Sequence, residues 1–433
     1  MATDVYAIIM GGGRGSRLRP LTRRRAKAAV PLAGKYRLVD VPISNCLHSG
    51  IRHIALVTQF NSDSLHRHIY RTYRFDAFGG RHIDILAAGQ TLDGPQKFEG
   101  PADAVRKNLR HFSHAKDGDL FLIMSGDQLY RMDYREVLRQ HQRTGARVTV
   151  ASKPVSFREV GSLGVLQLRD DLAVQGFIDK PQEPSFVDSL RPMARLSSTA
   201  TPTSASMFWI NMGVYVFEKR TLWDALADPM QKDFAREVIP SLVGRVPVYA
   251  FPFEGYWRDL GTVRSFFEAN LELTQPNPPF DFLEPGRSIY SHQRHLPAAR
   301  IHNSMIDDCL VAAGSVLTEV RARRSVIGVR SVVRQGTRLE NVVVMGLDSF
   351  ETEHEETQLI GDDQLFLGIG KNCSITRAII DKNARIGDNV ILSPQGVADG
   401  YEHGDIVVRD GILIVIKNGV VPSGTTVGRG MLS

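Results

Sequence analysis

The chain has 433 residues, more than one ordinary hydrophobic core accommodates, so two or three domains are expected. Hydrophobic residues make up 42% and charged residues 23%, as in globular proteins, and the formal net charge is a modest +6. The sequence has no basic stripe interleaved with aromatic residues, so we expect no nucleic acid partner. The longest apolar runs, such as residues 412–416, are too short to cross a bilayer, so we expect no membrane partner.

The cysteines and the first residues bear on the compartment. Cys46, Cys309 and Cys373 are far apart and lack the spacing of a zinc site or a disulfide framework, so buried free thiols are the better interpretation. The chain passes directly into a strand pattern without the charged leader and apolar core of a signal peptide. We therefore expect a cytoplasmic protein.

Short apolar runs alternate with helical patterns in the first half of the chain. The runs at Val5–Met10, His53–Thr58, 83–87 and 120–124 have the length of strands, and residues 101–112 have one apolar helical face. Buried strands that alternate with helices predict an α/β domain with a mostly parallel, Rossmann-like sheet covered on both faces. Ligands bind such sheets beyond the carboxyl ends of the strands.

A glycine-rich segment with the sequence GGGRGSRL follows the first run, at residues 11–18. Glycines let backbone N–H groups approach phosphate oxygens closely, and arginines neutralise those oxygens. The segment is neither a Walker A loop nor the GxGxxG pattern, and for the glycines alone a tight turn at the strand end remains the alternative. The candidate phosphate-binding residues are Gly11, Gly12, Gly13, Arg14, Gly15 and Arg17.

Two aspartates are candidates for a metal site. Asp127 follows the apolar run 120–124, and Asp259 follows an aromatic pair and an arginine. Carboxylate oxygens are the ligands that Mg²⁺ prefers. Spacing alone does not pair two such distant residues, and an aspartate in Asp127's position is also common in ordinary turns.

The pattern changes near residue 275. The proline-rich segment 275–279 cannot continue a helix and is typical of a linker. Beyond it, apolar residues recur at six-residue steps, the signature of a left-handed parallel β-helix, although a β-sandwich with chance spacing remains the alternative. We predict a first domain at 1–275, a linker at 276–295 and a β-helix at 296–433, interrupted by a polar loop at 348–364. The repeating pairs are Leu310 and Val316, Val326 and Val332, Ile369 and Ile375, Ile380 and Ile386, and Val421 and Val427.

An ordered set of motifs resembles the sugar-nucleotide pyrophosphorylases, and most closely the ADP-glucose pyrophosphorylase family in its cyanobacterial and plant form. The motifs include GGGRGSRLRPLT at 11–22, SGDQLYRMDY at 125–134, YWRDLGT at 256–262 and IIDKNARIG at 379–387. The resemblance covers nearly the whole chain. It implies a GT-A-like nucleotidyltransferase domain followed by the β-helix.

The resemblance implies transfer of AMP from ATP to α-D-glucose 1-phosphate, giving ADP-glucose and pyrophosphate, as the first committed step of glycogen or α-glucan synthesis. It further implies that Asp127 and Asp259 hold Mg²⁺ and that Arg14 and Lys27 act on the phosphates. Because a sugar phosphate oxygen is already anionic, the attack needs no general base. Catalysis then consists of positioning and charge neutralisation.

Further substrate-binding residues follow from the resemblance. Gln59 matches the family's base-reading glutamine, and Phe98 and Gly100 lie in the motif on the nucleotide side. On the sugar-phosphate side the matching residues are Gly164, Asp179, Lys180 and Asn211.

The sequence departs from the family around the base and the sugar, while the phosphate and metal groups persist. After its active-site lysine the family usually has proline, whereas this chain has Ala28. The family has an aromatic residue where this chain has Lys97, and threonine where this chain has Pro101. It has glutamate at Asp179, and serine at Asn211, which can still donate to a sugar hydroxyl. Chemistry is therefore expected to be retained, whereas base or sugar preference can differ.

Regulation and assembly also follow from the resemblance. Lys382 and Lys417 match lysines that bind an anionic activator such as 3-phosphoglycerate, and Arg294 matches an arginine linked to inhibition by phosphate. Decoration of an exposed β-helix face is the alternative for both lysines. The resemblance implies a homotetramer, with a hetero-oligomer as the alternative.

Three other functions remain open. The altered Pro101, Asp179 and Asn211 favour a nucleotidyltransferase with another base or sugar. Gln128, where histidine is more usual, resembles regulatory subunits of low activity. A β-helix acyltransferase is disfavoured because His302 has no identifiable partner.

Overall fold

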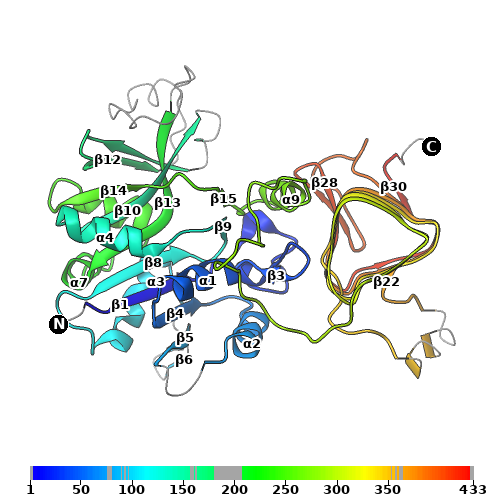
Figure 1. Ribbon diagram of the computed structural model, residues 1–433, viewed down its shortest axis with the longest axis horizontal. Coiled ribbons are helices and arrows are strands. Elements are labelled where there is room, and N and C mark those ends of the chain that lie inside the picture. The colour runs from blue at the N-terminus through cyan, green and yellow to red at the C-terminus, as the bar shows by residue number, and fades with distance from the viewer. Residues whose placement is uncertain are drawn as a thin grey trace.

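The computed structural model describes residues 3–429 except 76–79, 89, 92–93, 96, 157–159, 161–162, 180–206, 353, 356–357 and 360–363. Figure 1 shows an α/β unit, a triangular β-helix, and helix α9 (Val263–Glu272) between them. The first helices are α1 (Asp40–His48), α2 (Asp63–Thr72), α3 (Pro101–Asn108) and α4 (Tyr134–Thr144). Among the described residues, α7 (Lys219–Leu226) and α8 (Ile239–Leu242) follow before α9.

The central sheet has a parallel half and a mixed half. Strands β8, β1, β4 and β5 lie side by side in that order and are parallel, as the apolar runs predicted. Strand β13 is antiparallel to β8 and begins the mixed half, which the sequence did not indicate. The parallel strands are β1 (Val5–Met10), β4 (His53–Thr58), β5 (His82–Ala87) and β8 (Leu120–Ser125). The mixed half contains β10 (Val148–Ser156), β11 (Gly164–Leu168), β12 (Val174–Asp179), β13 (Met207–Glu218) and β14 (Val248–Pro252).

Both faces of the sheet are buried because side chains alternate along each strand. In β1, Ala7 and Ile9 face one core together with α1 and α9, and Tyr6 and Ile8 face a second core together with α3 and α7. Continuous apolar runs, rather than alternating ones, are therefore what this parallel sheet requires.

Short strand pairs lie outside the sheet: β2 (Pro31–Leu32) with β3 (Tyr36–Arg37), and β6 (Gln90–Thr91) with β7 (Gly94–Pro95).

The second unit is a β-helix whose coils stack in parallel register. Ile306, Ala322, Leu339 and Ile375 occupy equivalent positions in successive coils. One face contains β16 (Arg300–His302), β18 (Val316–Thr318), β20 (Val332–Val333), β22 (Gly368–Ile369), β24 (Arg385–Ile386) and β29 (Val420–Val421). The other strands are β17 (Met305–Val311), β19 (Arg321–Ile327), β21 (Arg338–Val344), β23 (Ser374–Ile380), β25 (Ile391–Leu392) and β30 (Thr426–Val427). Strand β28 (Ile412–Val415) stacks in parallel on β23, and β27 (Ile406–Arg409) and β26 (Glu402–His403) extend the sheet beyond it in antiparallel pairs.

The corners of the coils need left-handed backbone conformations. Asn303, Glu319, Gly336, Asn372 and Asn389 all have positive φ, at intervals that match the coil length. Glycine and asparagine tolerate this region best, which explains the small polar residues between the apolar hexads. Among the predicted pairs, Ile369, Ile375, Ile380, Ile386, Val421 and Val427 are buried inside the helix. The predicted polar loop 348–364 lies partly outside the described residues.

The two units share one hydrophobic core. Phe266 and Phe267 of α9 belong to the same buried cluster as Val326, Val343 and Ile379 of the β-helix. The β-helix is therefore packed against the first unit and not merely tethered to it. In the part of the chain that the structure describes, no helix combines the length and the apolar character needed for a membrane span.

Candidate active site

The glycine-rich segment leaves the carboxyl end of β1 beside β4. Gly11 N–H donates to Val57 O at 2.8 Å, which fixes the start of the loop. A Cβ on Gly12 would lie 2.6 Å from the backbone nitrogen of Gln59, whereas a Cβ on Gly13 would meet no atom within 4 Å. Gly12 thus allows the loop backbone to pack closely against the backbone of residues 58 and 59, and Gly13 faces open space in the cleft. Gly15, with φ of 57°, leads into the short 3₁₀ turn Ser16–Leu18.

An antiparallel strand pair brings the two candidate metal ligands together. After β8, Gly126 N–H donates to Met10 O at 3.1 Å, and the chain enters β9 (Gln128–Tyr130). This strand pairs with β15 (Trp257–Asp259), with Asp259 opposite Gln128. Asp127 is thus the neighbour of Gln128, the residue opposite Asp259. Both aspartates line the same cavity of about 400 Å³.

Basic side chains surround these carboxylates. The ammonium group of Lys27 forms an ion pair with the carboxylate of Asp127. A Cβ on Gly261 would lie 2.6 Å from Asp259 Oδ2 and 3.2 Å from Arg17 Nη2, so Asp259 and Arg17 flank the same glycine. Positive and negative groups at this spacing suit a metal ion and phosphate groups bound side by side.

The cleft consists of three adjoining cavities that all include Met10 and Asp127 in their walls. The glycine-rich loop, Lys27 and Asp127 line a small cavity of about 210 Å³. Arg14, Gln59 and Phe98 line a second cavity of about 560 Å³, which shares Gly13 with the small one. The cavity of about 400 Å³ that contains both aspartates shares Arg17 and Lys27 with it. The three cavities therefore form one continuous cleft around Asp127.

On the side of Arg14, Gln59 contacts the backbone of Phe98. With its amide oriented to satisfy both partners, Gln59 accepts from Phe98 N at 3.1 Å and donates to Phe98 O at 3.2 Å. The guanidinium group of Arg14 lies over the ring of Phe60 at 5.7 Å. Gly100 packs against Lys232, since a Cβ there would collide with the Lys232 carbonyl oxygen. The role of Gln59 in reading a base remains a prediction.

On the opposite side, Asn211 is fixed by two hydrogen bonds. Its Nδ2 donates to Tyr215 Oη at 2.7 Å, and its Oδ1 accepts from Gly213 N at 2.8 Å. Gly164 is in contact with the ring of Phe177, which lies 2.9 Å from where a Cβ would be. The backbone of Asp179 pairs with Gly164 at the end of β12. The side chain of Asp179 and the whole of Lys180 lie outside the described residues.

Several residues of the cleft were missed in the sequence. Asp233 lines the cavity of the two aspartates and caps the π-helical turn Phe234–Val238, where it accepts from Ala235 N at 2.8 Å. Its position before a helical segment was the available signal. Ser125 and Trp257 also line this cavity, and Trp257 Nε1 donates to Gln128 Oε1 at 3.1 Å. Gln128 is thus a buried structural partner of the tryptophan.

The donor set around Asp127 and Asp259 fits Mg²⁺. Among the described residues, no group of three or more His, Cys, Asp or Glu side chains could form a dedicated metal cage. Mg²⁺ commonly uses one or two carboxylates and takes its other ligands from water and substrate phosphates. Two carboxylates beside a phosphate-sized cavity match that mode.

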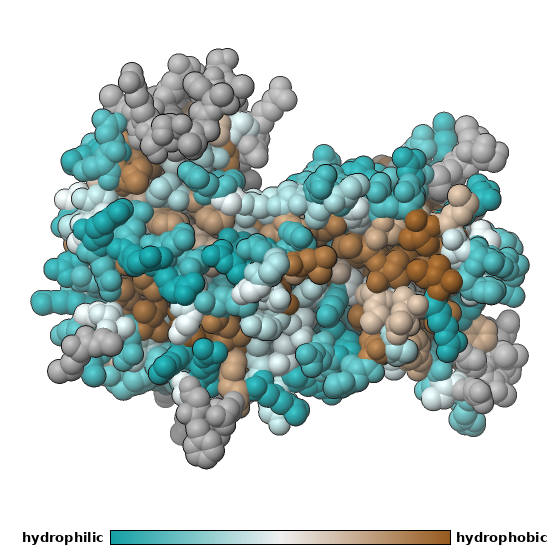
Figure 2. All heavy atoms as spheres, in the orientation of Figure 1, coloured by the Kyte–Doolittle hydropathy of each residue, from teal (hydrophilic) through white to brown (hydrophobic). Residues whose placement is uncertain are grey.

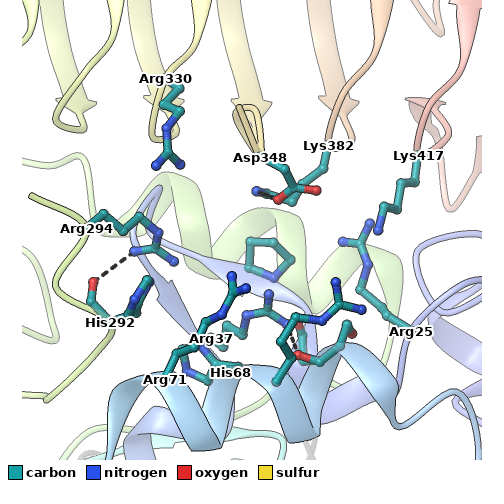
Figure 3. A pocket seen from close by; sticks show the side chains of 14 residues that line it. Arg25, Arg37, His68, Arg71, His292, Arg294, Arg330, Asp348, Lys382 and Lys417 are labelled. Carbon is teal, nitrogen blue, oxygen red and sulfur yellow. Dashed lines mark hydrogen bonds and ion pairs between the residues drawn. The ribbon is translucent and has the colours of Figure 1, made fainter. Parts of the chain in front are cut away.

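A second cluster lies between the two units, and Figure 3 shows its side chains converging from both. We call this space of about 250 Å³ the interdomain cavity. It brings together the three predicted regulatory residues, Arg294, Lys382 and Lys417. One carboxylate in its wall, Asp348, forms an ion pair with Lys382. The basic residues that the sequence reasoning missed are Arg25, Arg37, Arg67, Arg71 and Arg330.

Burial shifts the pKa values of the charged side chains in this cavity. Burial lowers the pKa of Lys382 to about 8 even though Asp348 opposes the change. Burial also lowers the pKa of Arg37 to about 10, and it lowers the pKa of Lys417. Burial would raise the pKa of Asp348, but Lys382 overrides it and lowers the net value. Cations outnumber carboxylates among the residues that line this cavity, so a bound anion would relieve their repulsion.

Two comparisons with protein families agree with this architecture. Residues 6–276 match the family model described as nucleotidyl transferase, and residues 294–426 match that described as GLGC left-handed parallel beta-helix domain. The first match covers more than half of the chain, so the protein belongs to the nucleotidyl transferase family. It is a nucleotidyltransferase whose α/β unit is followed by a left-handed parallel β-helix, as the sequence predicted.

The two loop glycines make a matched pair for mutagenesis. We expect Gly12→Ala to displace the loop and lower the midpoint of thermal unfolding by several degrees, because its Cβ would collide with the backbone of residues 58 and 59. Gly13→Ala should leave the midpoint within about one degree, since its Cβ would lie in open space. Differential scanning fluorimetry of both variants measures this, and equal midpoints would contradict the packing described here.

Proposed function

We propose that the protein transfers AMP from ATP to α-D-glucose 1-phosphate and releases pyrophosphate, in glycogen or α-glucan synthesis. The main support is the meeting of Asp127 and Asp259 beside Lys27 and the glycine-rich loop. The matched nucleotidyl transferase and GLGC β-helix families fit the ADP-glucose pyrophosphorylase family.

In the proposed reaction, an anionic oxygen of the sugar phosphate attacks the α-phosphorus of ATP, and the pyrophosphate group leaves on the opposite side. A bound Mg²⁺ supplies positive charge beside the phosphates, and Asp127 and Asp259 would hold it. Lys27 lies next to Asp127 and can neutralise a nonbridging phosphate oxygen, while Arg14 and Arg17 neutralise the departing pyrophosphate. The chain's task is to align two anions that otherwise repel each other.

We propose adenine and glucose as the base and sugar, on the motifs that carry the resemblance. One observation favours another specificity as the second candidate. The carbonyl oxygen of Asn211 accepts from Gly213 N, and one amide hydrogen is donated to Tyr215 Oη. The second amide hydrogen is left for a sugar hydroxyl. A low-activity regulatory subunit is a further alternative, although Lys27 and Asp127 remain in the cleft.

A panel assay tests the substrates directly. Pyrophosphate release would be measured with ATP, UTP, dTTP and GTP, each combined with glucose 1-phosphate and other sugar 1-phosphates. We expect ATP with glucose 1-phosphate to give the highest kcat/KM. A preference for another base would overturn the assignment of ATP, and negligible turnover with every pair would favour the regulatory-subunit alternative.

Removal of either candidate metal ligand should abolish most turnover. We expect Asp127→Asn and Asp259→Asn each to lower kcat by roughly 10²- to 10³-fold, the size of effect seen when one preorganised electrostatic group is lost. Asp224→Asn, on the exposed surface of α7, serves as the control and should retain full turnover. Steady-state kinetics over a range of MgCl₂ concentrations provides the measurement. Wild-type kcat in either cleft variant would refute the metal site.

We also propose that the interdomain cavity binds an anionic effector, such as 3-phosphoglycerate as an activator or phosphate as an inhibitor. The support is the excess of basic side chains around Lys382 and Lys417, which are half-buried or buried and do not merely decorate an outer face. Arg294 is held in this cavity by donation to the carbonyl oxygens of Lys35 and His292, both at 3.2 Å.

The pKa of Lys382 gives this effector proposal a pH signature. Below about pH 8 the Lys382 side chain is cationic, and above it the charge is lost, so anion affinity should fall as pH rises from 7 to 9. We expect sulfate, a phosphate analogue that remains a dianion over this whole range, to bind roughly tenfold more weakly at pH 9 than at pH 7, measured by titration calorimetry. Lys382→Gln and Lys417→Gln should weaken binding at pH 7 and abolish activation by 3-phosphoglycerate, while turnover without effector persists. The control Lys371→Gln, at an exposed β-helix site, should change nothing. Unchanged phosphate binding in both lysine variants would contradict the proposal.

Assembly into a homotetramer is proposed on the resemblance and on one exposed surface. Among the described residues, β16 and β17 are the end strands of their sheets in the first coil of the β-helix, and Ile301 and Met305 there are 49% and 68% exposed. Figure 2 shows hydrophobic residues gathered on the β-helix where Figure 1 draws its first coils. Open strand edges with apolar side chains are typical of assembly surfaces.

A further inference from the structure

One buried ion pair joins the two units of the protein. Arg25 Nη2 donates to Asp381 Oδ1 at 2.6 Å, and the two side chains are only 3% and 1% exposed. Arg25 Nη1 also donates to Met345 Sδ at 3.5 Å. A buried pair with this geometry fixes its partners, because either charge would be left unpaired if the other moved away.

On one side, this ion pair is close in the chain to the active-site lysine. Arg25 is two residues before Lys27, and the intervening Ala26 is buried and donates its N–H to Asn61 O at 2.9 Å. Ala29 N–H donates back to Ala26 O at 3.0 Å, and Val30 N–H to Lys27 O at 3.0 Å. The segment is thus a compact, hydrogen-bonded turn, through which a displacement of the Arg25 backbone can reach Lys27.

On the other side, the same carboxylate oxygen bonds to the backbone of a residue that lines the interdomain cavity. Asp381 Oδ1 accepts from Lys382 N at 2.6 Å as well as from Arg25. The side chain of Lys382 forms the ion pair with Asp348 in that cavity, and Arg25 itself belongs to the wall. Asp381 Oδ1 therefore accepts hydrogen bonds both from the backbone of Lys382 and from Arg25, which is two residues before Lys27.

We propose that the Arg25–Asp381 pair positions Lys27 and couples the interdomain cavity to the catalytic cleft. Arg25 is a positioning residue, which acts on the reaction through the placement of the Lys27 ammonium group beside Asp127. An anion that draws Lys382 or Arg25 toward it shifts both bonds at Asp381, and the short turn transmits that shift to Lys27. The proposal rests on the proposed function for its kinetic readout but not for its structural one.

A neighbouring ion pair supplies a matched control. Arg23 Nη2 and Glu402 Oε1 are 3.1 Å apart and also join the two units, but these side chains are 44% and 49% exposed. Solvent screens such a pair, so its loss should have little effect. Arg23→Gln therefore removes an interdomain ion pair from the same segment of the chain as Arg25 without disturbing the buried pair.

The kinetic arm compares three variants with the wild type. Because one unpaired buried charge can prevent folding, the main variant is the double substitution Arg25→Met/Asp381→Leu, which removes both charges together. We expect kcat for ATP and glucose 1-phosphate to fall roughly 10- to 100-fold with KM within about twofold, because the reacting groups are misplaced rather than unable to bind. Arg25→Lys keeps both charges and a donor to Asp381 and should retain intermediate kcat, and Arg23→Gln should retain wild-type kcat.

The structural arm does not depend on turnover. Hydrogen–deuterium exchange of the backbone amides of residues 26–30 is measured with and without inorganic phosphate as the probe. In the wild type and Arg23→Gln, phosphate should change exchange in this segment at least twofold. In the double variant, phosphate should leave it unchanged even though calorimetry still detects phosphate binding.

Two results would overturn the coupling: wild-type kcat in the double variant, or no effect of phosphate on exchange at residues 26–30 in the wild type. If the wild type turns over no substrate pair, the proposed function fails, and the exchange measurement alone decides the coupling.

Discussion

The pairing of β9 with β15 is the constraint on which the active site depends. Asp127 and Asp259 are far apart in sequence, and this two-stranded contact, extended by the hydrogen bond from Leu260 N to Asp127 O, places them in one cavity. Both strands are anchored from outside the pair: Gly126 is bonded to the end of β1, and Thr262 begins α9 with a capping box three residues after Asp259. The carboxylates are therefore held by the ends of buried elements and not by free loops, which is the rigidity that an electrostatic mechanism requires.

The interdomain cavity has an excess of positive charge, whereas the cavity that contains both candidate metal ligands is balanced. Of the residues that the structure describes, eight lysine and arginine side chains and one carboxylate, that of Asp348, line the interdomain cavity. In the cleft, by contrast, Arg17, Lys27 and Arg236 are matched by the carboxylates of Asp127, Asp233 and Asp259. Repulsion among the cations of the interdomain cavity destabilises the folded protein, and a bound anion would relieve it. The lowered pKa of Lys382 reflects this cost, because burial, together with the nearby arginines, favours its neutral form.

Local patterns predicted the elements better than their contacts. The apolar runs located the parallel strands, and the six-residue repeat located the β-helix, because each pattern reports burial within one segment. The antiparallel strand β13 and the pairing of β9 with β15 arise from long-range contacts that no local period encodes. The same limit applies to the interdomain cavity. Lys382 and Lys417 were found by resemblance, whereas Arg25 and Arg330 become neighbours only when the two units pack together.

The packing of the units makes the β-helix part of the scaffold of the cleft. On one side, Asp381 holds Arg25 and so the turn that carries Lys27. On the other side, Arg264 at the start of α9 is close in sequence to Asp259. Its backbone N–H donates to Asp410 Oδ2 of the β-helix at 3.1 Å. The two halves of the candidate active site are thus both in contact with the same β-helix. A shift of that domain by a fraction of an ångström would change the separation of Lys27 and Asp259, so a distant binding event needs no large motion to alter catalysis.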